Sequence, residues 1–325
     1  MGMENFSPEF QSPEQYIIDI TYKIWEKRGV SRINDWYAAD APVRNPHGVT
    51  NSVESVILHT LESMAEFPDE EALAEDVIIG DKESGFYSSH RVRWQATHLA
   101  DGYYGPATKR FVSSLTIADC LCRDNRVVGE WLLGDHAGIV QQLGLDPEAF
   151  GRKLGKQNPG AYRIGNEAMR KRWSDPQGLT IVGDSSIANC LLDTLSAIWN
   201  DKNLAVMDEQ YDRALRFEGP TNHIGFGRTQ AGNWLLSLLS AIPDGRFEPH
   251  HMIIRQQVGR PVRAAVRWSY CGTHSGHGRY GPPTGLPITI LAITHMELRD
   301  GLIANEWLVL DETAVYAQLA AYQTV

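Results

Sequence analysis

The chain has 325 residues, of which 42% are hydrophobic and 22% are charged, a composition typical of a globular protein. This length predicts about two domains. The formal net charge of −10 argues against nucleic acid as a partner, because phosphate binding requires a basic face.

The first half of the chain is expected to contain helices followed by strands. Residues 1–14 form a loose arm rich in proline and serine, and apolar side chains then recur with helical period before the period changes to two. The predicted helices are 13–25, 31–39 and 53–64, the predicted strands are 76–79, 90–98, 109–119 and 126–132, and a short helix over 135–143 follows.

Residues 151–180 are basic, polar and rich in Gly and Pro, which predicts a linker with one helical turn near 167–173. The second half then repeats the plan of the first. Its predicted helices are 184–199, 208–216 and 229–241, and its predicted strands are 250–257, 262–274, 286–298 and 302–309.

The two halves also share a series of motifs in the same order. In the first half these are Arg93-Trp94, Thr97-His98, Tyr104-Gly105-Pro106, Thr108, Glu130-Trp131 and Asp135; in the second they are Arg267-Trp268, Thr273-His274, Tyr280-Gly281-Pro282, Thr284, Glu306-Trp307 and Asp311. The offset is 174 residues up to Trp268 and 176 from His274, which predicts a two-residue insertion between Trp268 and Thr273.

The repeat predicts two tandem domains, residues 15–150 and 181–325. Helices followed by an antiparallel meander define an α+β fold in each domain. A curved sheet wrapped by about three helices forms a cone, and its open end is a natural place for a ligand pocket.

These motifs, with Gln142-Leu143-Gly144 after the first set, resemble the SnoaL-like polyketide cyclases. The second copy is more similar still, through Gly281-Pro282-Pro283-Thr284-Gly285 and the run 297–303. The resemblance covers residues 15–150 and 185–325 and implies the cone-shaped α+β barrel of the nuclear transport factor 2-like superfamily. It also implies a range of activities: cofactor-free aldol cyclases, isomerases, dehydratases, hydrolases, binding modules, and lyases that release formaldehyde from lignin-derived diaryl compounds.

The resemblance implies that Asp119 is the catalytic acid or base. Burial in an apolar strand would raise the pKa of this carboxyl and make it a usable base; the alternative is a strand-end residue paired with Arg91 or Arg93. The second copy has His295 at the matching position, and an imidazole suits proton transfer near neutral pH. Glu297, two residues further along the same strand, could orient that histidine; a core histidine is the alternative.

The remaining candidates would bind substrate. The two strand arginines could polarise a carbonyl group, the histidines and tyrosines could bond a ligand oxygen, and the aromatic rings would line the cones; exposed hairpin residues and shared fold positions are the alternatives. This set comprises Arg93, His98, Tyr104, Trp94 and Tyr37 in the first half, and His274, His277, Arg267, Tyr211 and Trp268 in the second.

Two functions are compatible with these features. The first is a cofactor-free lyase, cyclase or isomerase that uses acid–base chemistry on a hydrophobic, aromatic small molecule, in aldol or retro-aldol direction, deformylation of a lignin-derived diaryl compound included. The second is a binding or scaffold module with filled cones.

No cofactor, metal, nucleic acid or membrane partner is expected, and formation of a homo-oligomer is left open. Residues 1–10 lack the pattern of a signal peptide, and no apolar run reaches the roughly 18 residues that span a bilayer, so a cytoplasmic location is expected.

Overall fold

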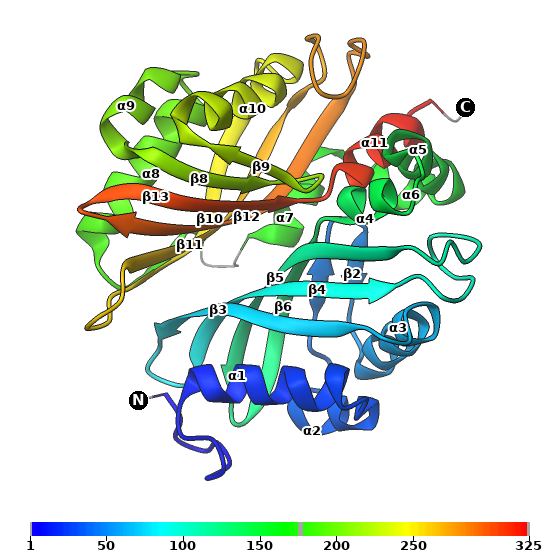
Figure 1. Ribbon diagram of the computed structural model, residues 1–325, viewed down its shortest axis with the longest axis vertical. Coiled ribbons are helices and arrows are strands. Elements are labelled where there is room, and N and C mark those ends of the chain that lie inside the picture. Colours follow the sequence, from blue (N-terminus) through cyan, green and yellow to red (C-terminus); the bar gives the residue numbers. More distant parts are fainter. Residues whose placement is uncertain (1, 175–177, 324–325) are drawn as a thin grey trace. The chain divides into compact units, whose positions relative to one another are not determined.

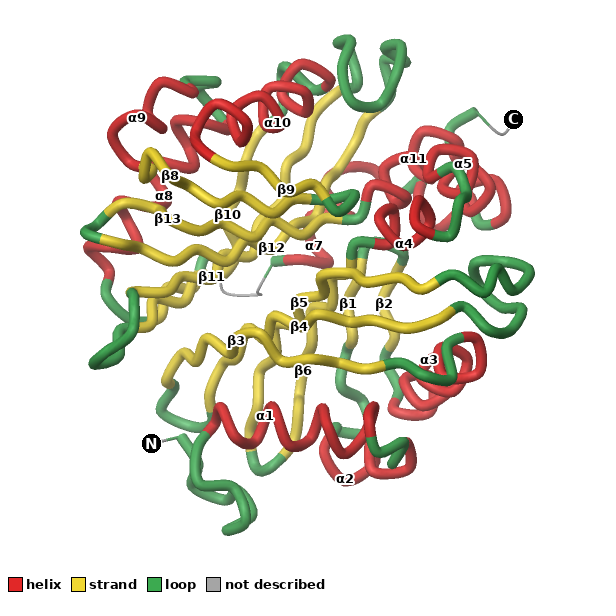
Figure 2. The backbone as a smooth tube through the Cα atoms, in the orientation of Figure 1, coloured by secondary structure: helices red, strands yellow, loops and turns green. Residues whose placement is uncertain are grey.

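Figure 1 shows the computed structural model, which describes residues 2–174 and 178–323. Backbone contacts divide the chain into two compact units, of which the first ends at Asp146 and the second begins at Pro147. Each unit holds one sheet with helices packed against it (Figure 2). The α+β class predicted from the sequence is therefore confirmed.

In the first unit, serines placed just before two apolar stretches start the main helices. Ser12 Oγ accepts a hydrogen bond from the N–H of Gln15, and Ser52 Oγ accepts one from Ser55. The helical segments are α1 (Pro13–Thr21), the π-helix η1 (Tyr22–Glu26), the 3-10 helix η2 (Val30–Arg32), α2 (Ile33–Trp36), α3 (Val53–Glu66) and α4 (His136–Gln142). The strands are β1 (Val43–Asn45), β2 (Gly48–Thr50), β3 (Glu71–Asp81), β4 (Phe86–Thr97), β5 (Phe111–Arg123) and β6 (Arg126–Gly134).

The second unit has a similar set of elements and some additions. Its helical segments are α5 (Pro147–Gln157), α6 (Pro159–Tyr162), α7 (Gly165–Trp173), α8 (Ser185–Trp199), η3 (Leu204–Val206), α9 (Met207–Gln210), α10 (Gly227–Ala241) and α11 (Glu312–Ala321). Its strands are β7 (Thr180–Val182), β8 (Tyr211–Gly219), β9 (His223–Phe226), β10 (Arg246–Arg255), β11 (Val262–Thr273), β12 (Pro287–Arg299) and β13 (Leu302–Leu310).

The two sheets have the same topology. The strand order is β2-β1-β6-β5-β4-β3 in the first unit and β9-β8-β13-β12-β11-β10 in the second, with β7 added beyond β10. In each unit the first long-range pair is parallel, β1 with β6 and β8 with β13, and the meander that follows is antiparallel. The shared order shows that the chain is a tandem duplicate.

Strand register corrects the alignment of the two copies. Trp94 lies opposite Ser114 in the first sheet, and in the second Ile290, which follows Ser114 by 176 residues, lies opposite Tyr270. Tyr270 is therefore the counterpart of Trp94, while Trp268 takes the place of a valine. The insertion predicted within β11 is wrong, because the offset is already 176 where that strand begins, and the repeated Arg-Trp pair is out of register by two residues.

One face of each sheet packs against the helices that precede its long strands, which are the helices meant by "helix-facing" below. In the second unit α7 lies against the opposite face, where Thr289 Oγ1 donates to Asn166 Oδ1. In the first sheet Phe86, Cys120 and Cys122 join the apolar cluster that contains Ile17 and Ile20 of α1, so the even-numbered positions of β4 and β5 face the helices. We call the helix-facing side chains of β4, β5 and β6 the first interior, and those of β11, β12 and β13 the second interior. In matching order the first comprises Ser88, His90, Val92, Trp94, Ser114, Thr116, Ala118, Cys120, Glu130, Leu132 and Gly134; the second comprises Ala264, Val266, Trp268, Tyr270, Ile290, Ala292, Thr294, Met296, Glu306, Leu308 and Leu310.

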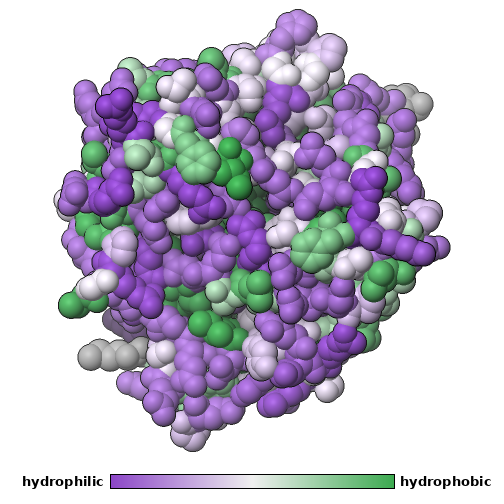
Figure 3. All heavy atoms as spheres, in the orientation of Figure 1, coloured by the Kyte–Doolittle hydropathy of each residue, from purple (hydrophilic) through white to green (hydrophobic). Residues whose placement is uncertain are grey.

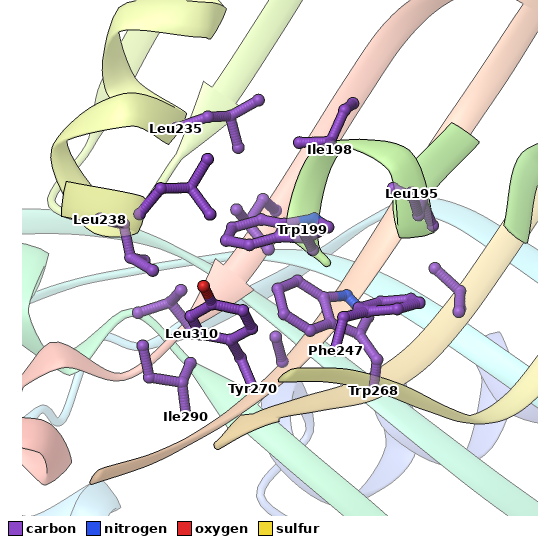
Figure 4. Close-up of a cluster of buried hydrophobic side chains, with 14 of the residues drawn as sticks. Leu195, Ile198, Trp199, Leu235, Leu238, Phe247, Trp268, Tyr270, Ile290 and Leu310 are labelled. Atoms are coloured by element: carbon purple, nitrogen blue, oxygen red, sulfur yellow. The ribbon is translucent and has the colours of Figure 1, made fainter. Parts of the chain in front are cut away.

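The second interior is filled by its own side chains (Figure 4). Trp199 of α8 packs on Trp268 and Tyr270, with ring centroids 4.8 and 5.2 Å apart. Trp268 is 1% exposed and Tyr270 is fully buried. Leu235 and Leu238 of α10 complete this cluster, which has the close packing of a protein core.

The structure differs from the sequence expectation in the two segments that flank the first domain. The arm at residues 1–14 is not loose: Phe6 packs edge-on against Tyr16 with ring centroids 5.0 Å apart, and Phe10 is buried. The linker expected at 151–180 carries most of α5, together with α6, α7 and the first residue of β7, and residues 175–177 of it lie outside the described part of the chain. Small residues allow α5 to approach α11 closely, since a Cβ on Gly155 would lie 2.1 Å from the carbonyl oxygen of Ala317.

The short strands were also missed. Residues 208–216 were expected to be helical, but the helix ends at Gln210 and β8 follows. β1, β2, β7 and β9 were not predicted, because three or four residues are too few to show a period of two. β1 and β7 moreover pair in parallel with distant strands, which leaves no local signal. Among the described residues no helix is long and apolar enough to cross a membrane, and hydrophilic residues cover most of the surface visible in Figure 3.

Candidate functional site

A buried tyrosine–glutamate pair lies in the first interior. Tyr37, which directly follows α2, donates a hydrogen bond from its hydroxyl to Glu130 Oε2 at 3.1 Å. Both side chains are buried. Burial raises the pKa of Glu130 to about 7, and the Tyr37 hydrogen bond only partly opposes this rise. Glu130 can therefore both bind and release a proton near neutral pH.

His90 is the second ionisable group of the first interior. It lies on β4 opposite Ala118 of β5 and Val77 of β3, and its side chain is 3% exposed. Burial, with Arg91 as a secondary cause, lowers the pKa of the imidazole to about 4, so it is neutral at pH 7. Within the described part of the chain, Nε2 of His90 has no hydrogen-bond partner. A neutral, buried nitrogen of this kind is available to a ligand.

The first interior is accessible whereas the second is closed. Several side chains that line the first interior are only half-buried. On the sheet these are Trp94, Thr116, Ala118 and Leu132, and on α3 they are Ser63 and Met64. The matching residues of the second unit, Tyr270, Ala292, Thr294, Leu308, Leu238 and Leu239, are all buried.

The difference follows from side-chain volume. Val92, Ser114 and Gly134 of the first unit correspond to Trp268, Ile290 and Leu310 of the second. Small residues at these positions leave space that bulky residues fill in the second copy.

Two rings, Tyr104 from a loop and His136 from the start of α4, border the first interior at Gly134. The hydroxyl of Tyr104 and Nδ1 of His136 are 2.6 Å apart. A Cβ on Gly134 would lie 3.7 Å from Nε2 of His136 and 3.3 Å from Oγ1 of Thr116, so the imidazole sits beside the sheet residues of the interior. Trp94, at this end of β4, donates from Nε1 to Glu70 Oε2 at 3.2 Å.

His98 has a structural role in the same region. Its ring nitrogens lie 2.9 Å from Glu66 Oε1 and 3.1 Å from Thr108 Oγ1, and Glu66 also accepts the backbone N–H groups of Tyr103 and Tyr104. This network holds the loop that carries the tyrosines. His98 therefore orients Tyr104 through the loop instead of lining the first interior.

Asp119 does not point into the first interior. It lies on β5 between Ala118 and Cys120, which both face the helices, so its side chain projects from the opposite face of the sheet, where Ser89 Oγ donates to Oδ1. Arg93 is on that same face, with its Nε 2.9 Å from Glu75 Oε1. Both residues were expected to act on a ligand inside the cone. The structure instead places their side chains on the other face of the sheet, because successive residues of a strand point to opposite faces.

Three candidates of the second unit also lie on the sheet face opposite the interior. His295 lies opposite Ala265 and Trp307 on the face away from α8 and α10, and Arg267 shares that face. Glu297, also on that face, accepts a hydrogen bond from Asn305 Nδ2 at 3.0 Å and does not contact His295 through any hydrogen bond among the described residues.

The other candidates of the second unit lie in a packed core or at the surface. Burial raises the pKa of Glu306 to about 7, and the adjacent Tyr211 hydroxyl opposes this rise, so the Tyr37–Glu130 pair has a counterpart. Trp268 donates from Nε1 to Thr294 Oγ1 at 2.9 Å. His274 contacts Thr284 at 3.1 Å, and His277 is exposed.

Neither unit by itself gathers three potential metal ligands among the described side chains. The ionisable groups of the first interior are the carboxyl of Glu130, the imidazole of His90 and the thiol of Cys120, and the phenol of Tyr37 bonds the carboxyl. Such a set can carry out proton transfer and hydrogen bonding.

Comparison with known proteins relates the second unit to a known family. Residues 189–319 match the model of the family described as SnoaL-like polyketide cyclase, so the second unit carries a SnoaL-like domain, and the first unit repeats its topology. The resemblance proposed from the motifs is confirmed.

Several solved structures are similar to part of the chain. TsrD from Streptomyces laurentii is 19% identical, with 43% of this chain and 98% of that chain covered and a TM-score of 0.37. A SnoaL-like polyketide cyclase from Agrobacterium tumefaciens is 21% identical over 41% and 97%, with a TM-score of 0.33. IdmH from Streptomyces antibioticus is 21% identical over 40% and 99%, with a TM-score of 0.36. Among curated proteins no sequence matches. Similarity at this level assigns no activity.

Sequence reasoning named Tyr37 and Trp94 but missed Glu130 and His90 as site residues. Glu130 was assigned to the shared fold because both copies have it. The available signal was polarity at helix-facing positions: His90 alternates with Val92 and Trp94 along β4, and Glu130 alternates with Leu132 along β6. Reading that alternation requires knowing which face packs on α1.

Proposed function

We propose that the first unit is a cofactor-independent acid–base catalyst that acts on a hydrophobic, aromatic small molecule. The observation that supports this most is the Glu130 carboxyl, whose pKa is raised to about 7 beside an accessible interior. A general base works best when its pKa lies near the working pH. Trp94, Ala118 and Leu132 supply apolar surface for a ring system.

The proposed reaction is an aldol-type carbon–carbon bond formation or its reverse. In the forward direction Glu130 takes a proton from the carbon next to a carbonyl group, the enolate carbon attacks a second carbonyl, and the new alkoxide takes the proton back. In the reverse direction Glu130 takes the proton of a β-hydroxyl group, the carbon–carbon bond breaks, and the released carbanion is protonated. Deformylation of a diaryl compound is one instance of this direction. Neither direction consumes an oxidant or a cofactor.

The second unit is proposed to support the first without catalysis. It holds an equivalent glutamate, but Trp268, Ile290 and Leu310 occupy the volume that a substrate would need. The scaffold function, which was considered for the whole chain, is therefore proposed for the second unit alone.

Paired substitutions test this division. Glu130→Gln and Glu306→Gln make the same change in matching places, and turnover would be measured on aryl β-diketones and aryl β-hydroxyketones by following the change in ultraviolet absorbance. We expect Glu130→Gln to lower kcat by about 10²- to 10⁴-fold, the usual contribution of a general base. Glu306→Gln should retain wild-type turnover. Full activity of Glu130→Gln, or equal losses in both variants, would refute the assignment.

A further inference from the structure

We propose that His90 is the residue that recognises the ligand in the first interior, through a hydrogen bond between its Nε2 and an oxygen of an uncharged aromatic compound. This inference shares its site with the proposed function but concerns binding, so it can be tested without turnover.

The fold itself does not require an imidazole at this position. The counterpart of His90 in the second unit is Val266, which is fully buried in an apolar core. A buried polar atom without a partner costs about 1–3 kcal/mol. Nε2 of His90 has no hydrogen-bond partner among the described residues, so it destabilises the ligand-free protein. A ligand that bonds this nitrogen would remove that free-energy cost.

The surroundings of His90 select against charge in the ligand. None of the helix-facing positions of β3–β6, all of which are described, is Lys or Arg. The two arginines of β4 project from the opposite face, where Arg91 and Arg93 contact Glu75 at 3.0 and 2.9 Å. A carboxylate or phosphate ligand would therefore meet no cation on this face of the sheet, whose buried charged group is Glu130, and its burial there would be unfavourable.

The spacing of the strands sets the size of the ligand. Glu130 on β6 and His90 on β4 are separated by one strand, β5, and by two residues along the strands, because Leu132 is the β6 residue level with His90. Two strand spacings of about 5 Å each and a rise of about 7 Å place the two residues about 12 Å apart. A ligand that contacts both groups must span this width while it packs on Ala118 and Leu132. An aromatic system of two rings with one hydroxyl or carbonyl group meets these requirements.

Isothermal titration calorimetry at pH 7 on the full chain tests the inference with three probes: 2-naphthol, naphthalene and 2-naphthoate. We expect 2-naphthol to bind more tightly than naphthalene, and 2-naphthoate to bind at least about 10-fold more weakly than 2-naphthol, because its carboxylate would be buried unpaired.

His90→Val copies the residue of the second unit and should weaken binding of 2-naphthol by about 3- to 10-fold while leaving naphthalene unchanged, the loss of one hydrogen bond. His90→Gln keeps a polar group on the same strand and should recover part of the affinity. A merely structural role would affect both probes alike.

Three outcomes would overturn the inference: unchanged binding of 2-naphthol by His90→Val, tight binding of 2-naphthoate, or no binding of 2-naphthol by the wild type. If His90→Val does not fold, the comparison of 2-naphthol with 2-naphthoate on the wild type still decides. Retention of this binding pattern together with full turnover by Glu130→Gln would reject the proposed catalysis and leave the role of His90 intact.

Discussion

Glu130 should make the folded chain less stable as pH rises, and the size of the effect follows from its pKa. The unfolded carboxyl titrates near 4.5 and the folded one near 7. The folded state therefore binds more protons between these values, so the free energy of unfolding falls as pH rises through this window and levels off above it. The folded pKa exceeds the unfolded pKa by about 2.5, which changes the free energy of unfolding by about 3 kcal/mol at about 1.36 kcal/mol for each pH unit.

Glu130→Gln removes this ionisation and keeps an oxygen that can accept the Tyr37 hydroxyl. The variant should be more stable than the wild type at pH 8, by up to about 3 kcal/mol, and close to it at pH 4.5. Glu306→Gln, the matched variant, should behave alike, because the pKa of Glu306 is also raised to about 7.

The assay is urea unfolding followed by circular dichroism from pH 4.5 to 9. His90 works in the opposite direction below pH 6.5, because its pKa is lowered in the folded state and the unfolded chain takes up the proton. The difference between variant and wild type, measured at each pH, cancels that contribution. A difference that does not change with pH would show that Glu130 is not buried as a titrating group, and the argument for catalysis would fail with it.

Three further substitutions give separate readouts. Gly134→Leu, which copies Leu310, should leave the chain folded but fill the first interior and reduce 2-naphthol binding by about 10-fold or more in the same calorimetric assay; undiminished binding would place the ligand elsewhere. Tyr37→Phe removes a hydrogen bond that lowers the pKa of Glu130, so the acid limb of the kcat/KM profile should move to higher pH, and an unmoved limb would exclude Glu130 as the base. Trp268→Ala should destabilise the second unit by about 3–5 kcal/mol in urea unfolding, as expected for a fully packed core position; a loss below about 1 kcal/mol would contradict the filled interior.

Two aspects of the fold could be predicted from the sequence because they are local. Helices and long strands follow from apolar periodicity of 3.6 and two, and the caps at Ser12 and Ser52 depend on neighbouring residues alone. The duplication was likewise visible in repeated aromatic motifs. What failed was the exact register, since a match such as Arg-Trp in each half cannot reveal a shift of two residues that leaves every side chain on the same face.

The candidate site was harder to predict, and the reasoning about it failed for an identifiable reason. Asp119 and its counterpart His295 were expected to be the acid–base residues, yet both lie on the sheet face opposite the two interiors. The residue that the copies share, Glu130, is the one with the raised pKa. The glutamate has a raised pKa of about 7 in both units, and the two units differ in access to it because the neighbouring side chains differ in volume.

The sequence by itself determined that the chain has two related α+β domains, since a repeated pattern of periodicity and motifs is a property of the chain alone. Only the tertiary structure decided which copy is accessible. That property depends on which face of each strand meets the helices, and on whether Gly134 or Leu310, Ser114 or Ile290, stands at the point of contact. Side chains far apart in the sequence make that contact, and a single-residue change of register would move each of them to the other face of the sheet.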